Sequence, residues 1–428
     1  KNRQYQQVEL IGSHIIEIQE LATSMDEMSS SIQDYQQQQV ALMDSFIELI
    51  GQAIDDKSPY TAGHCERVPE LGILLADAAS NSTLSAFSDF SFKNDDEVRE
   101  FRVAAWLHDC GKITTSEHIV DKGTKLETIY NRIHEIRTRF EVLWRDAEIA
   151  YLSGMIANSD NKTALLASKD AQQQKLQDDF AFIASANIGG EFMEKEHIER
   201  LKSLATITWQ RHFDDSLGLS PVEELRIPAS QSSLPVTESL LADKAEHIIG
   251  HDQPISYDEK LGIKIAIPKH RANLGELHNL TIARGTLTAE DRFKINEHII
   301  STIRMLDKMP FPSELARVPK YASTHHETLI GTGYPRQLTA EQLSIPERVL
   351  VLADIFEALT AADRPYKKAK PLSVSIDILH KMVLSQHVDP DIFKLFLSSG
   401  IYLQHIDKYL SAEQQDEIDI AYYLNYQP

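Results

Sequence analysis

Long helical periods dominate the pattern of apolar and polar positions along this chain, and glycine and proline are sparse. In the N-terminal part, apolar residues recur in alternating steps of three and four, with one polar break at Gln39. This heptad seam comprises Ile18, Leu21, Met25, Met28, Ile32, Tyr35, Leu42, Phe46 and Leu49. It predicts a coiled-coil stalk over residues 1–50 that forms a parallel homodimer. A long helix buried in its own domain is the alternative, and the polar QDYQQQQ stretch argues against it.

Two shorter helical patterns follow the stalk and carry histidines. The first runs from His64 to Ala79, and the Ser-, Asn- and Asp-rich stretch 81–96 after it predicts a loop. The second is an apolar run that ends on His108 and Asp109. A His-Asp pair alone would be explained as a capped helix end. A histidine one helix upstream, His64, and the doublet His325 and His326 favour a metal site instead.

Two later segments supply further candidate ligands. The stretch RVLVLADIFEALTAADRPY places Asp354 at the centre of an apolar helix. A buried carboxylate there needs a charged partner, and a metal ion is the simplest one. The stretch HHETLIGTGYP puts His325 and His326 side by side before a glycine-rich turn. This turn is a poor nucleotide-binding loop, because it lacks a GK[ST] ending and a preceding strand.

The span from Thr114 to Thr286 is a domain's worth of sequence and is predicted to be mainly helical. KLETIYNRIHEIRTRFEVLWRDAEIAYL predicts a charged amphipathic helix, and DAQQQKLQDDF predicts an exposed one. The apolar positions of the first helix are Ile129, Ile133, Ile136, Phe140 and Leu143. LGIKIAIP alternates as a strand does, which predicts a small β-hairpin near Lys264. The histidines of this span are expected to be structural or exposed: His197, His212 and His270.

Charge and composition limit the classes of partner. The net charge of −21 over 428 residues, with no basic run, argues against a nucleic-acid polymer or an acidic lipid surface. The two cysteines, Cys65 and Cys110, have no disulfide or zinc-ribbon spacing, so a reducing compartment is expected. No run of eighteen apolar residues occurs, and the sequence begins at Lys1. The sequence therefore leaves open whether a membrane sensor precedes this chain.

Together these motifs resemble the HD superfamily of metal-dependent phosphohydrolases, and within it the HD-GYP branch of cyclic di-GMP phosphodiesterases. The resemblance covers roughly Ile54 to Lys122 and Leu287 to Tyr366, with the motifs in the family's order. The matching positions are His64, the pair His108 and Asp109, Lys112, His298, the doublet His325 and His326, the GYP residues Gly333, Tyr334 and Pro335, Asp354, Arg364 and Lys367. The segment EIQELATSMDEMSSSI also resembles the second helix of a HAMP signalling linker.

The resemblance implies a two-metal site. His64, His108 and Asp354 would hold one ion, and His298, His325 and His326 the other, with Asp109 bridging them. Lys112 would neutralise charge on the scissile phosphodiester, with Tyr334, Arg364 and Lys367 near the substrate. The sulfur-free donor set favours Fe or Mn, and two ions about 3.5–4 Å apart can share a hydroxide for in-line displacement. Relatives with three metals carry a glutamate where this chain has Tyr60, which favours two.

The predicted architecture is all-α. A coiled-coil stalk (1–50) leads into an HD-type domain (51–113 and 286–410), which is interrupted by a mainly helical insertion (114–285) and followed by a tail (411–428). The expected location is cytoplasmic, as the output part of a bacterial inner-membrane receptor.

The predicted function is hydrolysis of cyclic di-GMP to pGpG or on to GMP. The alternatives are an HD enzyme for cyclic GMP-AMP or another nucleotide, a non-catalytic nucleotide receptor, and an interaction scaffold. The complete set of candidate ligands argues against the receptor.

Overall fold

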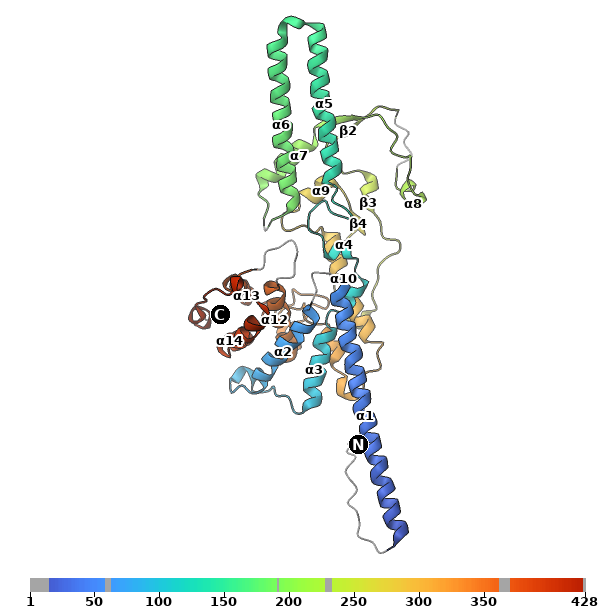
Figure 1. Ribbon diagram of the computed structural model, residues 1–428, viewed down its shortest axis with the longest axis vertical. Helices are drawn as coiled ribbons and strands as arrows, with labels where there is room; N and C mark the ends of the chain where they lie inside the picture. Colours follow the sequence, from blue (N-terminus) through green and yellow to red (C-terminus); the bar gives the residue numbers. More distant parts are fainter. Residues whose placement is uncertain (1–14, 58–62, 191, 228–232, 362–369, 426–428) are drawn as a thin grey trace. The chain divides into compact units, whose positions relative to one another are not determined.

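The computed structural model describes residues 15–57, 63–190, 192–227, 233–361 and 370–425. The chain is mainly helical, as predicted, and its strands form two small antiparallel pairs (Figure 1). It packs into two compact units. The first unit holds residues 1–110, 302–330 and 339–428, and the second holds residues 111–301 and 331–338. No helix in the described part of the chain has the length and apolar character needed to cross a membrane.

The N-terminal part of the first unit is one long helix, α1 (Ile16–Lys57). The predicted helix is therefore present, and most of its heptad seam is exposed: Leu21, Met28, Phe46 and Leu49 are each more than half exposed. Its C-terminal turns are different, because Ile47, Gly51 and Ile54 are buried. Gly51 faces the ring of Trp106 on α3 (Asp95–Leu107). The coiled coil and the HAMP likeness stay predictions.

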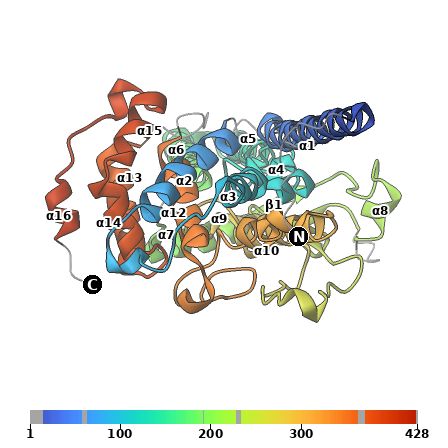
Figure 2. The same ribbon diagram turned by 90° about the horizontal axis from the view of Figure 1, so that it is seen from below.

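The core of the first unit is formed by helices that the sequence places far apart. They are α2 (His64–Ser80), α3 (Asp95–Leu107), α11 (Val318–Ala322), α12 (Ile345–Thr360), α13 (Leu372–Leu384), α14 (Pro390–Ser398), α15 (Ile401–Tyr409) and α16 (Ile420–Leu424). Figure 2 shows α12 beside α2, and α12 also contacts α13 and α14. The all-apolar face of α12 is buried at this junction, and Leu350, Leu352 and Phe356 have no exposed surface. This packing brings Asp354 to α2.

Local capping fixes where the helices that carry the site begin. Asn94 accepts a hydrogen bond from the amide of Glu97 at 3.0 Å, which starts α3. Ser344 and Glu347 form a capping box at the start of α12. Gly63 has a φ of 74°, a conformation that favours glycine, and the chain enters α2 directly after it.

The second unit is built on an antiparallel pair of long helices, α5 (Ile133–Ala157) and α6 (Lys162–Ile188) (Figure 1). Its core also includes residues of α7 (Lys195–Ala205) and α9 (Glu276–Leu280). The unit further contains α4 (Glu117–Val120), α8 (Pro221–Glu224) and most of α10 (Ala289–Leu306). The prediction that the first arm helix begins near Lys125 is wrong, and Ile129 lies outside it, 89% exposed. The amides of Lys125 and Leu126 donate instead to the backbone and side-chain oxygens of Asn187.

Small antiparallel strand pairs are present in the insertion (114–285), as predicted, but the segment around Lys264 is not one of their strands. The small sheets lie elsewhere, pairing β1 (Thr208–Arg211) with β2 (Val236–Ser239) and β3 (Ile248–Ile249) with β4 (Ala272–Asn273). The amide of Lys264 donates to the carbonyl of Pro335 at 2.8 Å, and Arg336 Nε donates to the carbonyl of Leu261 at 3.0 Å. The alternating segment is thus held by the GYP turn rather than by a partner strand.

Candidate metal centre

Four predicted ligands meet inside the first unit. They are His64 at the start of α2, His108 and Asp109 directly after α3, and Asp354 in the middle of α12, and all are buried. Nε2 of His64 lies 3.3 Å from Oδ2 of Asp109 and 3.2 Å from Oδ1 of Asp354. Nε2 of His108 lies 3.3 Å and 3.8 Å from the same two oxygens. Two imidazoles and two carboxylates therefore surround one point.

The two imidazoles are oriented by bonds at their other nitrogen. His108 donates from Nδ1 to the carbonyl of Ala105 at 2.6 Å, and His64 donates from Nδ1 to Oε2 of Glu357. Glu357 also accepts from Arg67 Nε at 2.6 Å. Within the described part of the chain, Nε2 of His64 and Nε2 of His108 make no hydrogen bond. This arrangement is typical of metal-binding histidines, whose second nitrogen is fixed by a carboxylate or a carbonyl.

The carboxylates of this cluster stabilise positive charge on its two histidines. Burial alone would lower the pKa of His108, but the carboxylates of Asp109 and Asp354 outweigh it and raise the pKa to about 9. Burial would also lower the pKa of His64. The surrounding carboxylates outweigh it, Glu357 most strongly, and raise this pKa well above its ordinary value. Protons on the imidazoles balance the carboxylates here, and a divalent cation can replace those protons.

A second group shares Asp109 with the first. Asp109, His325 and His326 each offer a ligand atom, and these atoms lie within 4.8 Å of one another. His325 donates from Nδ1 to the carbonyl of Ala322 at 3.0 Å, and its Nε2 lies 3.8 Å from Oδ1 of Asp109. Asp109 thus turns Oδ2 toward His64 and His108, and Oδ1 toward His325. One carboxylate between two groups of donors fits a bridging ligand.

The other predicted site residues are placed differently. His298 is buried on α10, donates from Nδ1 to the carbonyl of Ile295 at 2.6 Å and belongs to the second unit. Lys112 lies in the short 3-10 helix Cys110–Thr114, directly after Asp109 in the chain. Tyr334 lines a cleft of the second unit. The remaining predicted positions lie outside the described residues: Tyr60, Arg364 and Lys367.

Two residues of the site were not found by sequence reasoning. Glu357 is buried and follows Asp354 by three residues, and Arg67 follows His64 by the same step. Each pair therefore lies on one helix face. That spacing was the available clue, because a buried glutamate one turn from a candidate ligand also needs a partner.

The donor set fits a hard or borderline transition metal. The two groups offer imidazole nitrogens and carboxylate oxygens, and neither buried cysteine belongs to them. Such sets suit Fe, Mn or Zn, and the absence of thiolate separates them from structural zinc sites.

Comparison with known proteins covers the part of this site that includes His325, His326 and Asp354. Residues 235–392 match the HD domain family. The chain carries an HD domain over these residues. Similar proteins include 3'3'-cGAMP-specific phosphodiesterase 3 of Vibrio cholerae, 27% identical over 40% of this chain and 41% of the relative. They also include 3'3'-cGAMP-specific phosphodiesterase 1 of the same organism, 26% identical over 49% of this chain and 48% of the relative.

A third relative is a cyclic di-GMP phosphodiesterase of Thermotoga maritima, 29% identical over 32% of this chain and 36% of the relative. The chain thus spans half or less of the length of each of these relatives. All three relatives are named as phosphodiesterases of cyclic dinucleotides.

Proposed function

We propose that the HD-GYP domain of this chain is a metal-dependent phosphodiesterase that hydrolyses cyclic di-GMP to pGpG or on to GMP. The position of Asp109 carries this proposal, because its two carboxylate oxygens face two separate groups of buried histidines. A pair of cations bridged in this way is the usual arrangement for phosphodiester hydrolysis.

His64, His108, Asp109 and Asp354 would hold one ion, and His325 and His326 the other, again with Asp109. We assign His298 to the second ion as its remaining ligand. In support, Thr302 lies one turn after His298 on α10, and its hydroxyl donates to the carbonyl of His108 at 3.3 Å. Bound Fe or Mn would lower the pKa of a water molecule and neutralise the phosphate.

The protein's own residues would position the substrate and balance its charge. Lys112 lies three residues after Asp109 in the chain, and its ammonium group is proposed to stabilise the charge that develops on the scissile phosphate. Arg364 and Lys367 are proposed to bind the remaining phosphate oxygens. Burial of His64, His108, His325 and Asp109 limits the access of bulk water to this site, which strengthens each of these interactions.

Regulation through the N-terminal helix is the further part of this proposal. The exposed apolar seam of α1 supports a parallel dimer, and α1 contacts α3, whose last residue directly precedes His108. We propose that an upstream membrane sensor changes the packing of this dimer and so the metal site, with the described chain on the cytoplasmic side.

A second substrate has a specific observation in its favour. The relatives that align over 40% and 49% of this chain are named as specific for 3'3'-cGAMP. Hydrolysis of the mixed cyclic dinucleotide is therefore the alternative to cyclic di-GMP.

The test is product formation from the two cyclic dinucleotides in parallel. Anaerobically purified protein is loaded with Fe(II) or Mn(II), and a His325→Ala, His326→Ala variant serves as the inactive control. We expect linear products from the wild type only, and the ratio of the two kcat/KM values identifies the preferred substrate. Tight binding of both nucleotides with no turnover by the loaded wild type would contradict the proposal and favour a receptor.

A further inference from the structure

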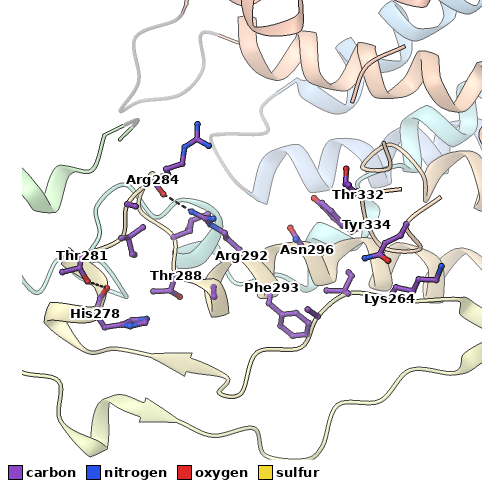
Figure 3. A pocket seen from close by; sticks show the side chains of 18 residues that line it. Lys264, His278, Thr281, Arg284, Thr288, Arg292, Phe293, Asn296, Thr332 and Tyr334 are labelled. Atoms are coloured by element: carbon purple, nitrogen blue, oxygen red, sulfur yellow. Dashed lines mark hydrogen bonds between the residues drawn. The ribbon is translucent and has the colours of Figure 1, made fainter. Parts of the chain in front are cut away.

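The second unit contains a cleft whose lining includes none of the candidate metal ligands. Its volume is about 800 Å³, and segments 264–266, 278–296 and 332–337 contribute its lining (Figure 3). All of these residues belong to the second unit. The cleft is large enough for a drug-sized or nucleotide-sized ligand.

The charge of the cleft is opposite to that of the chain. The protein has 64 acidic and 43 basic residues, yet the lining contains Lys264, Arg284 and Arg292 and no Asp or Glu. Within the described residues, none of these three side chains forms a salt bridge with a carboxylate, and all three are exposed. Three cations without a counter-charge, in a strongly acidic protein, favour an anionic ligand.

One of these cations is held in place by the protein. Arg292 donates from Nη2 to the carbonyl of Arg284 at 2.9 Å, which brings the two arginines to the same end of the cleft (Figure 3). Guanidinium groups match phosphate oxygens with paired hydrogen bonds. This end of the cleft therefore suits a phosphate chain.

The other end of the cleft has the features of a base-binding surface. Tyr334 lies there half-buried, and Asn296 and Thr332 lie close to it along the cleft (Figure 3). An aromatic ring can stack on a nucleobase, and amide and hydroxyl groups can bond its edge. Phosphate-binding and base-binding features thus lie in one cleft.

The cleft faces away from the predicted metal ligand on the same helix. Arg292 and Asn296 are one turn apart on α10 and line the cleft, whereas His298 does not line it. Each residue turns an α-helix by about 100°, so His298, two residues after Asn296, lies on the opposite side of α10. A ligand in the cleft would therefore not contact the metal ligand on this helix.

From these observations we propose that the cleft binds a nucleoside polyphosphate at a site separate from the metal centre. Arg284 and Arg292 bind the phosphates, and Tyr334, which lies with Lys264 at the other end of the cleft, stacks on the base (Figure 3). The proposal goes beyond phosphodiester hydrolysis, and the prediction that Tyr334 contacts the substrate is not needed for it.

Binding is measured by titrating the full chain, freed of metal with a chelator, with GTP, ATP and inorganic phosphate. We expect one saturable nucleotide site per chain and at least a tenfold loss of affinity in an Arg284→Glu, Arg292→Glu variant. The control is Arg145→Glu, Lys202→Glu, which changes the net charge equally on the same unit and lies outside the cleft. Tyr334→Ala should weaken nucleotide binding and leave phosphate binding unchanged.

Three results would overturn the proposal. They are the absence of saturable nucleotide binding, equal binding by the cleft variant and its control, and binding of phosphate as tight as that of GTP. Hydrolysis is measured separately with Mn(II)-loaded protein. An unchanged KM for cyclic dinucleotides in the Arg284→Glu, Arg292→Glu variant supports a separate site, and a raised KM would make the cleft part of the substrate site and refute the separation.

Discussion

His64 and Glu357 are hydrogen-bonded through the imidazole Nδ1, although 293 residues separate them in the chain. The other oxygen of Glu357 accepts from Arg67, so the carboxylate is fixed at both ends. This bond sets the orientation of His64 and turns its Nε2 toward Asp109 and Asp354. A carboxylate in this position also makes the imidazole a stronger donor to a metal ion.

Replacement of Glu357 should therefore weaken metal binding. In Glu357→Ala, we expect the affinity for Mn(II) to fall about 10–100-fold, because His64 loses both its orientation and its basicity. The affinity of Glu357→Gln for Mn(II) should fall less, since the amide oxygen can still accept a hydrogen bond from Nδ1 of His64. Metal titration of the folded proteins measures this. Glu66→Ala, an exposed change on the same helix as His64, is the control and should match the wild type. Equal affinities in all four proteins would contradict the orienting role.

Metal binding should release protons. The pKa of His108 in the metal-free protein is about 9, so this imidazole is protonated at neutral pH and must lose its proton to bind a cation. We expect the apparent affinity for Mn(II) to rise with pH between pH 6.5 and pH 9 and to level off above it. Titration calorimetry in buffers of different ionisation enthalpy counts the protons. No proton release at pH 7 would contradict this picture.

Gly51 should resist substitution even though it lies inside a helix. A Cβ atom there would lie 2.6 Å from Cε3 of Trp106, two residues before His108 on the same segment. Overpacking costs about 1–3 kcal/mol, whereas alanine in place of a helical glycine gains about 1 kcal/mol. We expect Gly51→Ala to unfold at a lower temperature than the wild type. Gly250→Ala is the control, because a Cβ there meets nothing within 4 Å. A stabilised Gly51→Ala protein would show that α1 does not pack closely on Trp106.

The buried His405 should destabilise the first unit in acid. Burial lowers its pKa to about 4, and its ring packs against Phe356 at 5.5 Å between centroids. Between pH 6.5 and pH 4 the unfolded chain binds this proton and the folded chain does not, so the free energy of unfolding decreases as the pH falls. The full effect of this group is up to about 3 kcal/mol.

Denaturant titrations at pH 7 and pH 4.5 test this effect. We expect His405→Gln to lose less stability than the wild type between the two pH values. His212→Gln, at an exposed position, should behave as the wild type does. Equal losses in the wild type and His405→Gln would contradict a neutral buried His405.

Much of the first unit could be predicted because its helices carry continuous apolar patterns. The apolar run of α12 predicted both the helix and the need of Asp354 for a partner, and the structure places His64 and His108 beside it. The motif order predicted that Asp109 and the doublet His325 and His326 meet. Local patterns suffice here because each ligand lies in or directly after a helix with one buried face.

The errors of prediction have long-range causes. The segment around Lys264 alternates like a strand, but its amide bonds to Pro335, which is more than seventy positions later in the chain. Lys125 and Leu126 have helical spacing with the residues after them, but they bond to Asn187. A periodic pattern does not reveal such partners. Glu357 was missed for the same reason, because its importance depends on a contact with His64.

The central claim is that two metal ions share Asp109, and the most direct measurement is the number of Mn or Fe ions bound per chain. Mass spectrometry of metal in anaerobically purified protein should give about two ions per wild-type chain, as expected for a two-metal hydrolase. Asp354→Ala and His326→Ala should each retain about one, because each removes a ligand from only one of the groups. A wild-type chain that binds one ion or none, or variants that retain the full number, would contradict the account.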